Sequence, residues 1–266
     1  MQTFYNDCPE LCSLMTNTAF SPDRSPSKGF SAIAWYRSAP VHLQFAGVTT
    51  CLIALVMIAS TTTLVIHREV GTHATALLHK AFWVDQETNI ATLFAFSLLA
   101  MASLLTSVLA FFKVMTGERW RFYWVALGAI LLFMAYDEAA QVHEKLGPPI
   151  RQLTGASGAL YFAWVIPGMI GVLGIAGIYL RMVLSLPAYQ RNLILVSGAV
   201  FVFGAIGMEM VGSFIFDGIG RYTVAYAIAT TLEETFEMLG VMIFCTAILS
   251  LIEATPLAQS FRRRPT

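Results

Sequence analysis

Six long apolar stretches are the feature that most constrains what this chain can fold into. An α-helix needs about 20 apolar residues to cross the hydrocarbon core of a bilayer. Stretches of that length are expected at roughly 43–66, 90–115, 121–146, 159–184, 192–216 and 224–252. The sequence therefore predicts an all-α, polytopic membrane bundle of six transmembrane helices.

The composition agrees with a membrane protein and excludes several other classes. Hydrophobic residues make up 57% of the chain and charged residues 12%, whereas about a quarter of the residues in soluble domains are charged. The formal net charge is zero, so no basic excess indicates a nucleic-acid partner. The sequence contains no Gly-rich phosphate loop, so we expect no nucleotide cofactor. We therefore expect partners in the membrane, namely lipids and a lipid-like small-molecule substrate, and the oligomeric state stays open.

The distribution of Lys and Arg predicts the orientation. The two tails and the second and fourth connections hold eleven of the 16 basic residues, and the other three connections hold five. Because cytoplasmic flanks retain positive charge, both termini are predicted inside, N-in/C-in, in a bacterial inner (cytoplasmic) membrane. We expect an irregular cytoplasmic leader at 1–42, a six-helix domain at 43–252 and a basic cytoplasmic tail at 253–266. A true start farther along the chain is the alternative for the leader.

Acidic residues interrupt three of the predicted spans, although a carboxylate is costly to bury in a bilayer. YDEAAQVHEKLG (136–147) ends the third span, AIGMEMVGS (205–213) lies in the fifth, and TTLEETFEMLG (230–240) begins the sixth. With both termini inside, all three segments reach the outer half of the membrane. The candidate site for a metal or protons comprises Asp137, Glu138, His143, Glu144, Glu209, Glu233, Glu234 and Glu237.

Helical geometry at about 100° per residue divides these residues among faces. Asp137, Gln141 and Glu144 share one face of the third span. Glu233 and Glu237 share one face of the sixth span. Three helices are therefore expected to bring carboxylates to one level.

The remaining residues of the third span point elsewhere if the helix is regular. His143 aligns with Tyr136, and Glu138 aligns with Lys145, a base at the rim that can pair with Glu138 or Glu144. No Lys or Arg lies in the interior of any predicted span. The deeper acids therefore require protonation or a bound cation. Packing is the alternative for each acid alone, whereas the whole set favours an ion-linked function.

Oxygen-rich ligands with few nitrogens favour a divalent metal ion, iron or manganese ahead of calcium, magnesium or zinc. His143 is the first candidate for a nitrogen ligand, followed by His67, His73 and His79 in the first outer connection. No Glu-x-x-His occurs, which weakens the case for a di-iron bundle. We predict a metal-dependent enzyme, an oxidoreductase or hydrolase, acting on a lipid or isoprenoid. A divalent-cation or proton-coupled transporter and a non-catalytic membrane assembly subunit are the alternatives.

Two further patterns predict local structure. ATALLHKAFWVD (74–85) places Leu77, Leu78, Phe82 and Trp83 on one helical side, as expected of an interfacial helix, with a loop that caps the bundle as the alternative. Glycines recur every three residues in the fourth span, which predicts close helix packing there. They are Gly168, Gly171, Gly174 and Gly177.

YDEAAQVHEKLG together with TTLEETFEMLG resembles a group of uncharacterised bacterial polytopic inner-membrane proteins. Members of that group carry a DExxxxHE-type stretch and a later LEExxEMLG-type stretch. The resemblance covers the third span and the start of the sixth. It implies that the acids of these two segments and His143 form one constellation, and it implies no particular chemistry.

Overall fold

The computed structural model describes residues 39–86 and 88–255, and all regular structure among them is helical. Six helical stretches in this part of the chain are long and apolar enough to cross a membrane. They are α3 (Val41–Val70), α5 (Ile90–Met115), α6 (Arg121–Ala140), α8 (Val165–Leu184), the stretch Ala188–Ile219, and α11 (Val224–Glu253). The prediction of a six-span helical membrane protein is thus confirmed by length and composition. Most of the predicted leader and tail, with Cys8 and Cys12, lie outside the described residues.

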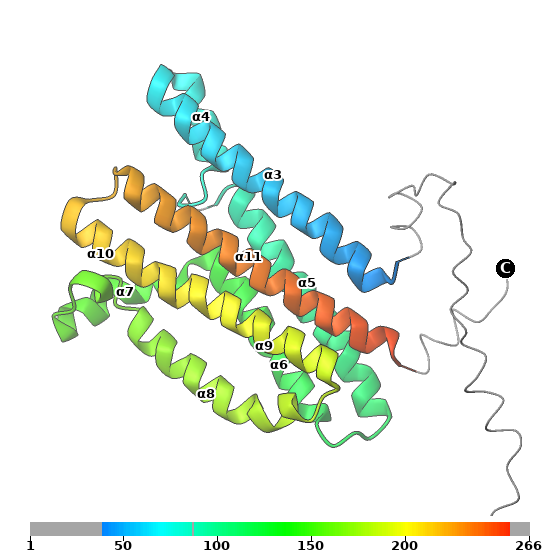
Figure 1. Ribbon diagram of the computed structural model, residues 1–266. Helices are drawn as coiled ribbons and strands as arrows, with labels where there is room; N and C mark the ends of the chain where they lie inside the picture. Colours follow the sequence, from blue (N-terminus) through cyan, green and yellow to red (C-terminus); the bar gives the residue numbers. More distant parts are fainter. Residues whose placement is uncertain (1–38, 87, 256–266) are drawn as a thin grey trace, which may run out of the picture. The chain divides into compact units, whose positions relative to one another are not determined.

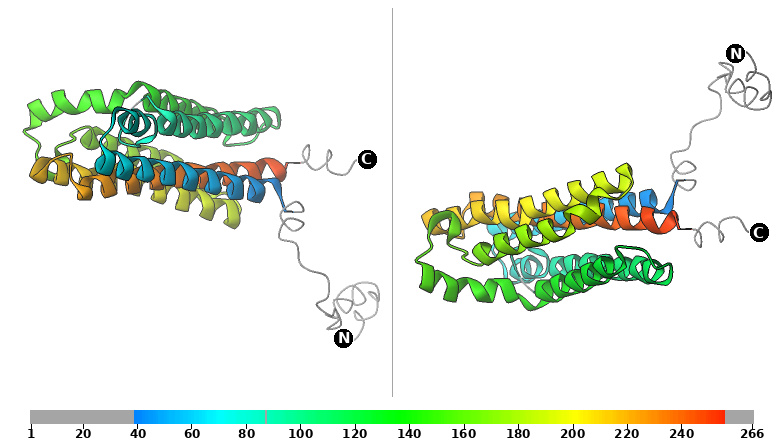
Figure 2. Two further views of the ribbon diagram at one scale, coloured as in Figure 1. Left: turned by 90° about the horizontal axis from the view of Figure 1, so that it is seen from above. Right: turned by 90° about the horizontal axis from the view of Figure 1, so that it is seen from below.

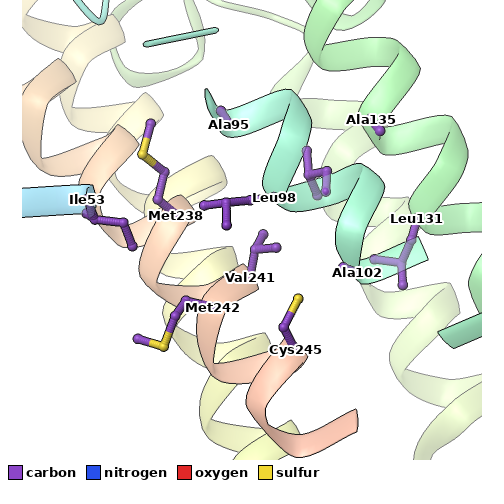
Figure 3. Close-up of a cluster of buried hydrophobic side chains, with 11 residues drawn as sticks. Ile53, Ala95, Leu98, Ala102, Leu131, Ala135, Met238, Val241, Met242 and Cys245 are labelled. Carbon is purple, nitrogen blue, oxygen red and sulfur yellow. The ribbon is translucent and has the colours of Figure 1, made fainter. Parts of the chain in front are cut away.

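The helix α11 is the centre of the bundle. It contacts α3, α5 and α9, and it is the most buried of the long helices (Figure 1). The pair α5 and α6 lies beside the layer that contains α3 and α11 (Figure 2). Side chains from four helices meet in the main apolar cluster, among them Ile53 of α3, Leu98 of α5, Leu131 of α6 and Met238 of α11 (Figure 3). The cluster joins the two layers.

Small and hydroxyl residues let these helices approach closely. The Ser103 hydroxyl of α5 donates to the Gly128 carbonyl of α6 at 2.8 Å, and the Ser197 hydroxyl donates to the Gly240 carbonyl of α11 at 2.9 Å. Such interhelical hydrogen bonds to backbone carbonyls require close contact between helix surfaces. These two hydrogen bonds hold α6 against α5 and the fifth span against α11.

The third predicted span is not one continuous helix. It divides at Gln141, whose φ of 55° is left-handed, into α6 and α7 (Val142–Thr154). The helix α7 then continues through Pro148 and Pro149, although proline usually kinks or breaks a helix interior. The prediction of an unbroken helix over 121–146 is therefore wrong, because the chain turns between Asp137 and His143.

The fifth span also contains an irregularity. A π-helix, η2 (Phe203–Met208), separates α9 (Ala188–Val202) from α10 (Glu209–Ile219). Single π-helical turns inside α-helices are frequent at functional sites. Here the π-helix ends directly before Glu209, so both helix irregularities adjoin predicted site residues.

The fourth span shows that the glycine prediction is largely wrong. A Cβ on Gly168 would lie 2.9 Å from the Trp164 ring, but one on Gly171, Gly174 or Gly177 would meet nothing within 4 Å. A three-residue repeat in a helix of 3.6 residues per turn shifts by about 60° at each step. The four glycines therefore wind around α8 instead of forming one packed face.

The first connection, between α3 and α5, forms a short helix and then a segment that covers the bundle. After α4 (His73–Phe82), the backbone N–H of Val84 donates to the buried Ser60 hydroxyl at 3.2 Å. Trp83 is 5% exposed, whereas Leu77 is 57% exposed. The expectation that Leu77, Leu78, Phe82 and Trp83 share one side in the interface is therefore wrong for Trp83, which closes the bundle. A short 3-10 turn, η1 (Gly158–Leu160), completes the described helices.

Candidate functional site

A cavity of about 380 Å³ is lined by all eight predicted site residues. We call it the acidic cavity. Its ionisable residues come from the end of α6, the start of α7, the start of α10 and the first half of α11, namely Asp137, Glu138, His143, Glu144, Glu209, Glu233, Glu234 and Glu237. The acidic segments of the third, fifth and sixth spans thus line one cavity, as expected from the similar depths of these acids within their spans.

Much of the remaining lining of the acidic cavity is apolar. One face of α8 contributes Trp164, Pro167, Gly168, Gly171, Val172 and Ile175. Further apolar side chains come from α6 and α9, such as Phe133 and Phe201. Gly168 and Gly171 widen the cavity because neither has a side chain. The cavity therefore joins a group of ionisable residues to an apolar surface that lies between α6 and α8.

Asp137 and His143 form an ion pair across the turn at Gln141. The His143 Nδ1 lies 2.8 Å from one Asp137 oxygen, and the His143 backbone N–H donates to the other at 2.9 Å. Asp137 thereby caps the start of α7, as short acidic side chains do at helix N-termini. The predicted alignments of His143 with Tyr136 and of Asp137 with Gln141 are wrong because of this turn.

The Asp137 carboxylate also fixes the state of the His143 ring. Burial lowers the pKa of His143, but the hydrogen bond and the charge of Asp137 outweigh it, and the pKa rises to about 9. The raised pKa favours the imidazolium form at neutral pH, in which Nδ1–H donates to Asp137. Its second nitrogen, Nε2, is left as the donor for another group, and the ring lies against Trp164 with centroids 4.7 Å apart.

Trp164 and two glutamates form a second contact in the acidic cavity. The Trp164 indole N–H donates to Glu209 Oε1 at 2.6 Å, and the carboxyl groups of Glu209 and Glu233 hydrogen-bond each other. Two carboxyl groups form such a bond only when one of them carries a proton. We therefore expect a proton between Glu209 and Glu233, which come from the fifth and sixth spans.

The π-helix and Gly204 bring the fifth span against these glutamates. A Cβ on Gly204 would lie 2.9 Å from the Glu233 carbonyl oxygen and 3.0 Å from the Glu237 backbone nitrogen. Only glycine permits this approach without a shift of one helix. No pattern in the sequence predicts the π-helix. The glycine five residues before Glu209 is the feature that could have drawn attention to this part of the span.

The rim bases do not pair with the acids in the way predicted. The Lys145 ammonium donates to the Ala140 carbonyl and not to Glu138 or Glu144. Between described residues, the contact of His143 with Asp137 is the ion pair that joins two members of the acidic cavity. Glu138 and Glu237 therefore line the cavity beside other carboxyl groups, without a cationic partner from Lys145.

Within residues 39–86 and 88–255, no group of three or more His, Cys, Asp or Glu side chains is arranged to hold a metal ion. The acidic cavity supplies suitable donors, since carboxylate oxygens and one imidazole nitrogen suit iron or manganese. Their side chains would have to move together around an ion. The predicted loop ligands are not in the acidic cavity: His67 and His79 line a separate cavity, and His73 is exposed. Metal binding stays a prediction.

Alkaline pH should weaken the junction between α6 and α7. Because the pKa of His143 is raised from 6.5 to about 9, the stabilisation by its ion pair is complete below pH 6.5 and is lost as the pH rises through about 9. For this partly exposed pair we expect a loss on the order of 1 kcal/mol, or a few degrees in apparent Tm. Thermal unfolding in detergent between pH 7 and 10 measures it, and the slope should flatten in Asp137→Asn. An equal slope in that variant would assign the effect to other groups.

The comparisons with known proteins identify a family but no activity. No curated protein and no solved structure matches the chain. Residues 47–251, which include every residue that lines the acidic cavity, match the family described as "Domain of unknown function (DUF8692)". The chain therefore belongs to the DUF8692 family.

Proposed function

We propose that the protein is a membrane enzyme that acts on a lipid-like substrate in the acidic cavity. The observation that carries this proposal is the mixed lining of the acidic cavity, which combines eight ionisable residues with apolar side chains of α6, α8 and α9. Pockets for organic ligands combine apolar walls with a few polar groups that fix orientation. A path for ions alone needs no apolar wall of this extent, whereas an amphiphile needs both surfaces.

The residues of the acidic cavity support acid–base chemistry. The protonated His143 can donate a hydrogen bond or a proton through Nε2 to an oxygen of the substrate, and Asp137 holds the ring for that role. A carboxylate such as Glu237 lies on the same cavity and can accept a proton. Because Glu209 and Glu233 share a proton, one supplies an acid while its neighbour supplies a base. Hydrolysis and isomerisation both use such a pair of groups.

The proposed enzyme has two possible forms, one that uses acid–base chemistry alone and one that also uses a bound divalent metal ion. Carboxylate oxygens of the acidic cavity and Nε2 of His143 would hold it, and it would supply a Lewis acid or an oxygen-activating centre. Elemental analysis of purified protein, before and after incubation with Fe(II), Mn, Zn and Ca, decides between the forms. A bound ion at one equivalent supports the metal-dependent form. Protein that stays metal-free rules out that form and leaves the acid–base form.

The proposed orientation places the acidic cavity in the outer half of a bacterial inner membrane, with both termini in the cytoplasm. The excess of Lys and Arg in the tails and in the second and fourth connections supports this orientation. The acids come from the end of α6, the start of α7, the start of α10 and the first half of α11, so they lie in the half of the bundle toward α7 and the turn between α10 and α11. A lipid-like substrate would then reach the cavity from the outer leaflet, between α6 and α8.

Gly171→Leu should block the apolar wall of the acidic cavity. A Cβ at Gly171 meets nothing within 4 Å, so a leucine fits without moving α8, and its side chain fills the space between α8 and α6. A photoactivatable alkyl-chain probe should label peptides of α6 and α8 in the wild-type protein, and labelling of α6 should fall severalfold in the variant. Labelled peptides are located by mass spectrometry.

Gly177→Leu is the matched control. A Cβ on Gly177 also meets nothing within 4 Å, but Gly177 does not line the acidic cavity, so its leucine should leave the labelling of α6 unchanged. Equal labelling of α6 in the wild-type protein and Gly171→Leu would show that no alkyl chain occupies the apolar wall. That outcome removes the lipid-like substrate from the proposal.

A proton-coupled transporter is the second candidate. The proton shared by Glu209 and Glu233 and the two helix irregularities beside acidic residues favour it, because transporters place ion sites at interrupted helices. Reconstitution into vesicles separates the candidates. A proton flux that depends on Glu233 and on an imposed gradient indicates transport, whereas an enzyme changes the substrate without such a flux. An assembly subunit would tolerate Glu233→Gln in both measurements.

A further inference from the structure

A second cavity, of about 460 Å³, lies between α3, α4, the segment after α4 and the start of α11. We call it the basic cavity, after His67, Arg68, His79 and Arg221, which line it together with a single acid, Asp85. None of these five residues lines the acidic cavity. The basic cavity thus shares no lining residue with the acidic cavity, and a third cavity of about 490 Å³ lies between them, lined by Asp85 and Arg221 and also by Glu209 and Glu233.

Asp85 does not neutralise the basic cavity because its carboxylate is already engaged. The Arg221 guanidinium donates to it through Nη2 at 2.7 Å and through Nε at 3.0 Å, and the Tyr226 hydroxyl donates to its other oxygen at 3.0 Å. These contacts leave Arg68 without an ion pair among the described residues. The cavity thus holds one uncompensated guanidinium beside two imidazoles.

The two imidazoles are stacked beside Arg68. The rings of His67 and His79 lie 5.2 Å apart at an angle of 15°, and His67 Nδ1 contacts the Thr75 hydroxyl at 3.3 Å. Burial, with the nearby His67 and Arg68, lowers the pKa of His79. Its Nδ1 is buried and has no hydrogen-bond partner among the described residues, which favours the proton on Nε2 and makes that nitrogen a donor. The basic cavity therefore combines the positive charge of Arg68 with hydrogen-bond donors of the two imidazoles.

The length of α3 favours a position of the basic cavity near the lipid headgroups. The helix α3 has 30 residues and spans about 45 Å, whereas the hydrocarbon core of a bilayer is about 30 Å thick. Arg68 stands in the last turn of α3, and Trp83, Tyr222 and Tyr226 line the same cavity. Arginine and amphipathic aromatic side chains are typical of the membrane interface, where phosphate groups are abundant.

We propose that the basic cavity binds a phosphate group, carried by a lipid headgroup or free in solution. Arg68 supplies the charge and several N–H donors, and His67 and His79 supply further donors on the same wall. The tyrosines and Trp83 form the sides of the site. The site does not depend on the function proposed for the acidic cavity, since the two cavities share none of the basic residues.

Calorimetric titration of the purified protein in a neutral maltoside detergent tests the proposal, with dodecyl phosphate and inorganic phosphate as the two probes. Binding of dodecyl phosphate alone identifies a lipid headgroup as the source, and binding of both identifies a site for the free anion. In either case Arg68→Gln should weaken binding by about tenfold or more, because a charge-assisted pair is lost. Affinity should also rise as the pH falls, since an anion favours protonated His79.

Arg181→Gln is the matched control, because Arg181 stands in the last turn of α8 and does not line the basic cavity. This variant should bind dodecyl phosphate as the wild-type protein does. Thermal unfolding of Arg68→Gln should show that the variant is folded. The proposal is overturned if neither probe binds the wild-type protein, or if folded Arg68→Gln binds the probe with unchanged affinity.

Discussion

Glu209→Gln and Glu233→Gln should each abolish the infrared signal of the proton that these two carboxyl groups share. The groups hydrogen-bond each other, and Trp164 donates to Glu209 from the other side. An amide at either position supplies its own N–H donor to the remaining carboxylate, so a shared proton is no longer needed. Either variant alone should therefore remove the part of the carboxyl band that belongs to the hydrogen-bonded pair of Glu209 and Glu233.

The same two variants should lower turnover of the lipid-like substrate by about 10²–10⁴-fold, the usual contribution of a general acid or base. Infrared difference spectra in light and heavy water measure the band, and Glu118→Gln is the control, since Glu118 pairs with Lys113 away from the cavity. If Glu209→Gln keeps the full band while Glu233→Gln loses it, Glu209 is a packing residue. Turnover that is unchanged in both variants would contradict the proposed function itself.

The spans could be predicted because apolar length is a local property of the sequence. The helix α5 has the predicted bounds 90–115, and α11 extends one residue beyond the predicted 224–252. The meeting of the acids also follows from local information, since each acid has a fixed depth within its span. Glu209 and Glu233 thus reach one cavity without any knowledge of how the helices pack.

The contacts inside the acidic cavity could not be predicted because they depend on two irregular turns. On a regular helix, Asp137 and His143 are six residues apart and face different sides. The left-handed Gln141 turns the chain so that Asp137 instead caps α7 through the His143 N–H. A residue other than glycine rarely adopts this conformation, and nothing in the sequence around Gln141 marks it.

The error on the glycines of α8 has a related cause. Their recurrence every three residues predicts close helix packing, but only a spacing close to 3.6 keeps residues on one side of a helix. Gly168 packs against Trp164, whereas Gly171 opens into the acidic cavity and Gly177 has no neighbour within 4 Å. A glycine in a membrane helix thus marks either a close approach or an open space, and only the tertiary structure distinguishes them.

The close approach of α9 to α11 occurs at Gly240, three residues after Glu237. A Cβ at this position would lie 2.7 Å from Phe201 Cβ and 2.8 Å from both the Cα and the backbone nitrogen of Phe201. Backbone atoms cannot move away from an added Cβ as the end of a flexible side chain can. The Gly240 carbonyl also accepts the Ser197 hydroxyl of α9, so any separation of the two helices breaks that hydrogen bond as well.

Gly240→Ala should therefore destabilise the protein by about 1–3 kcal/mol or more, the usual cost of overpacking, and lower the apparent Tm by several degrees. Thermal unfolding in detergent measures the change. Gly177→Ala is the control, because its Cβ meets nothing within 4 Å and alanine favours helix, so its Tm should be unchanged or slightly higher. Equal Tm values for the two variants would mean that α9 and α11 are farther apart than this packing requires. The glutamates of α11 would then lie farther from Glu209, and the shared proton with Glu233 would lose its structural basis.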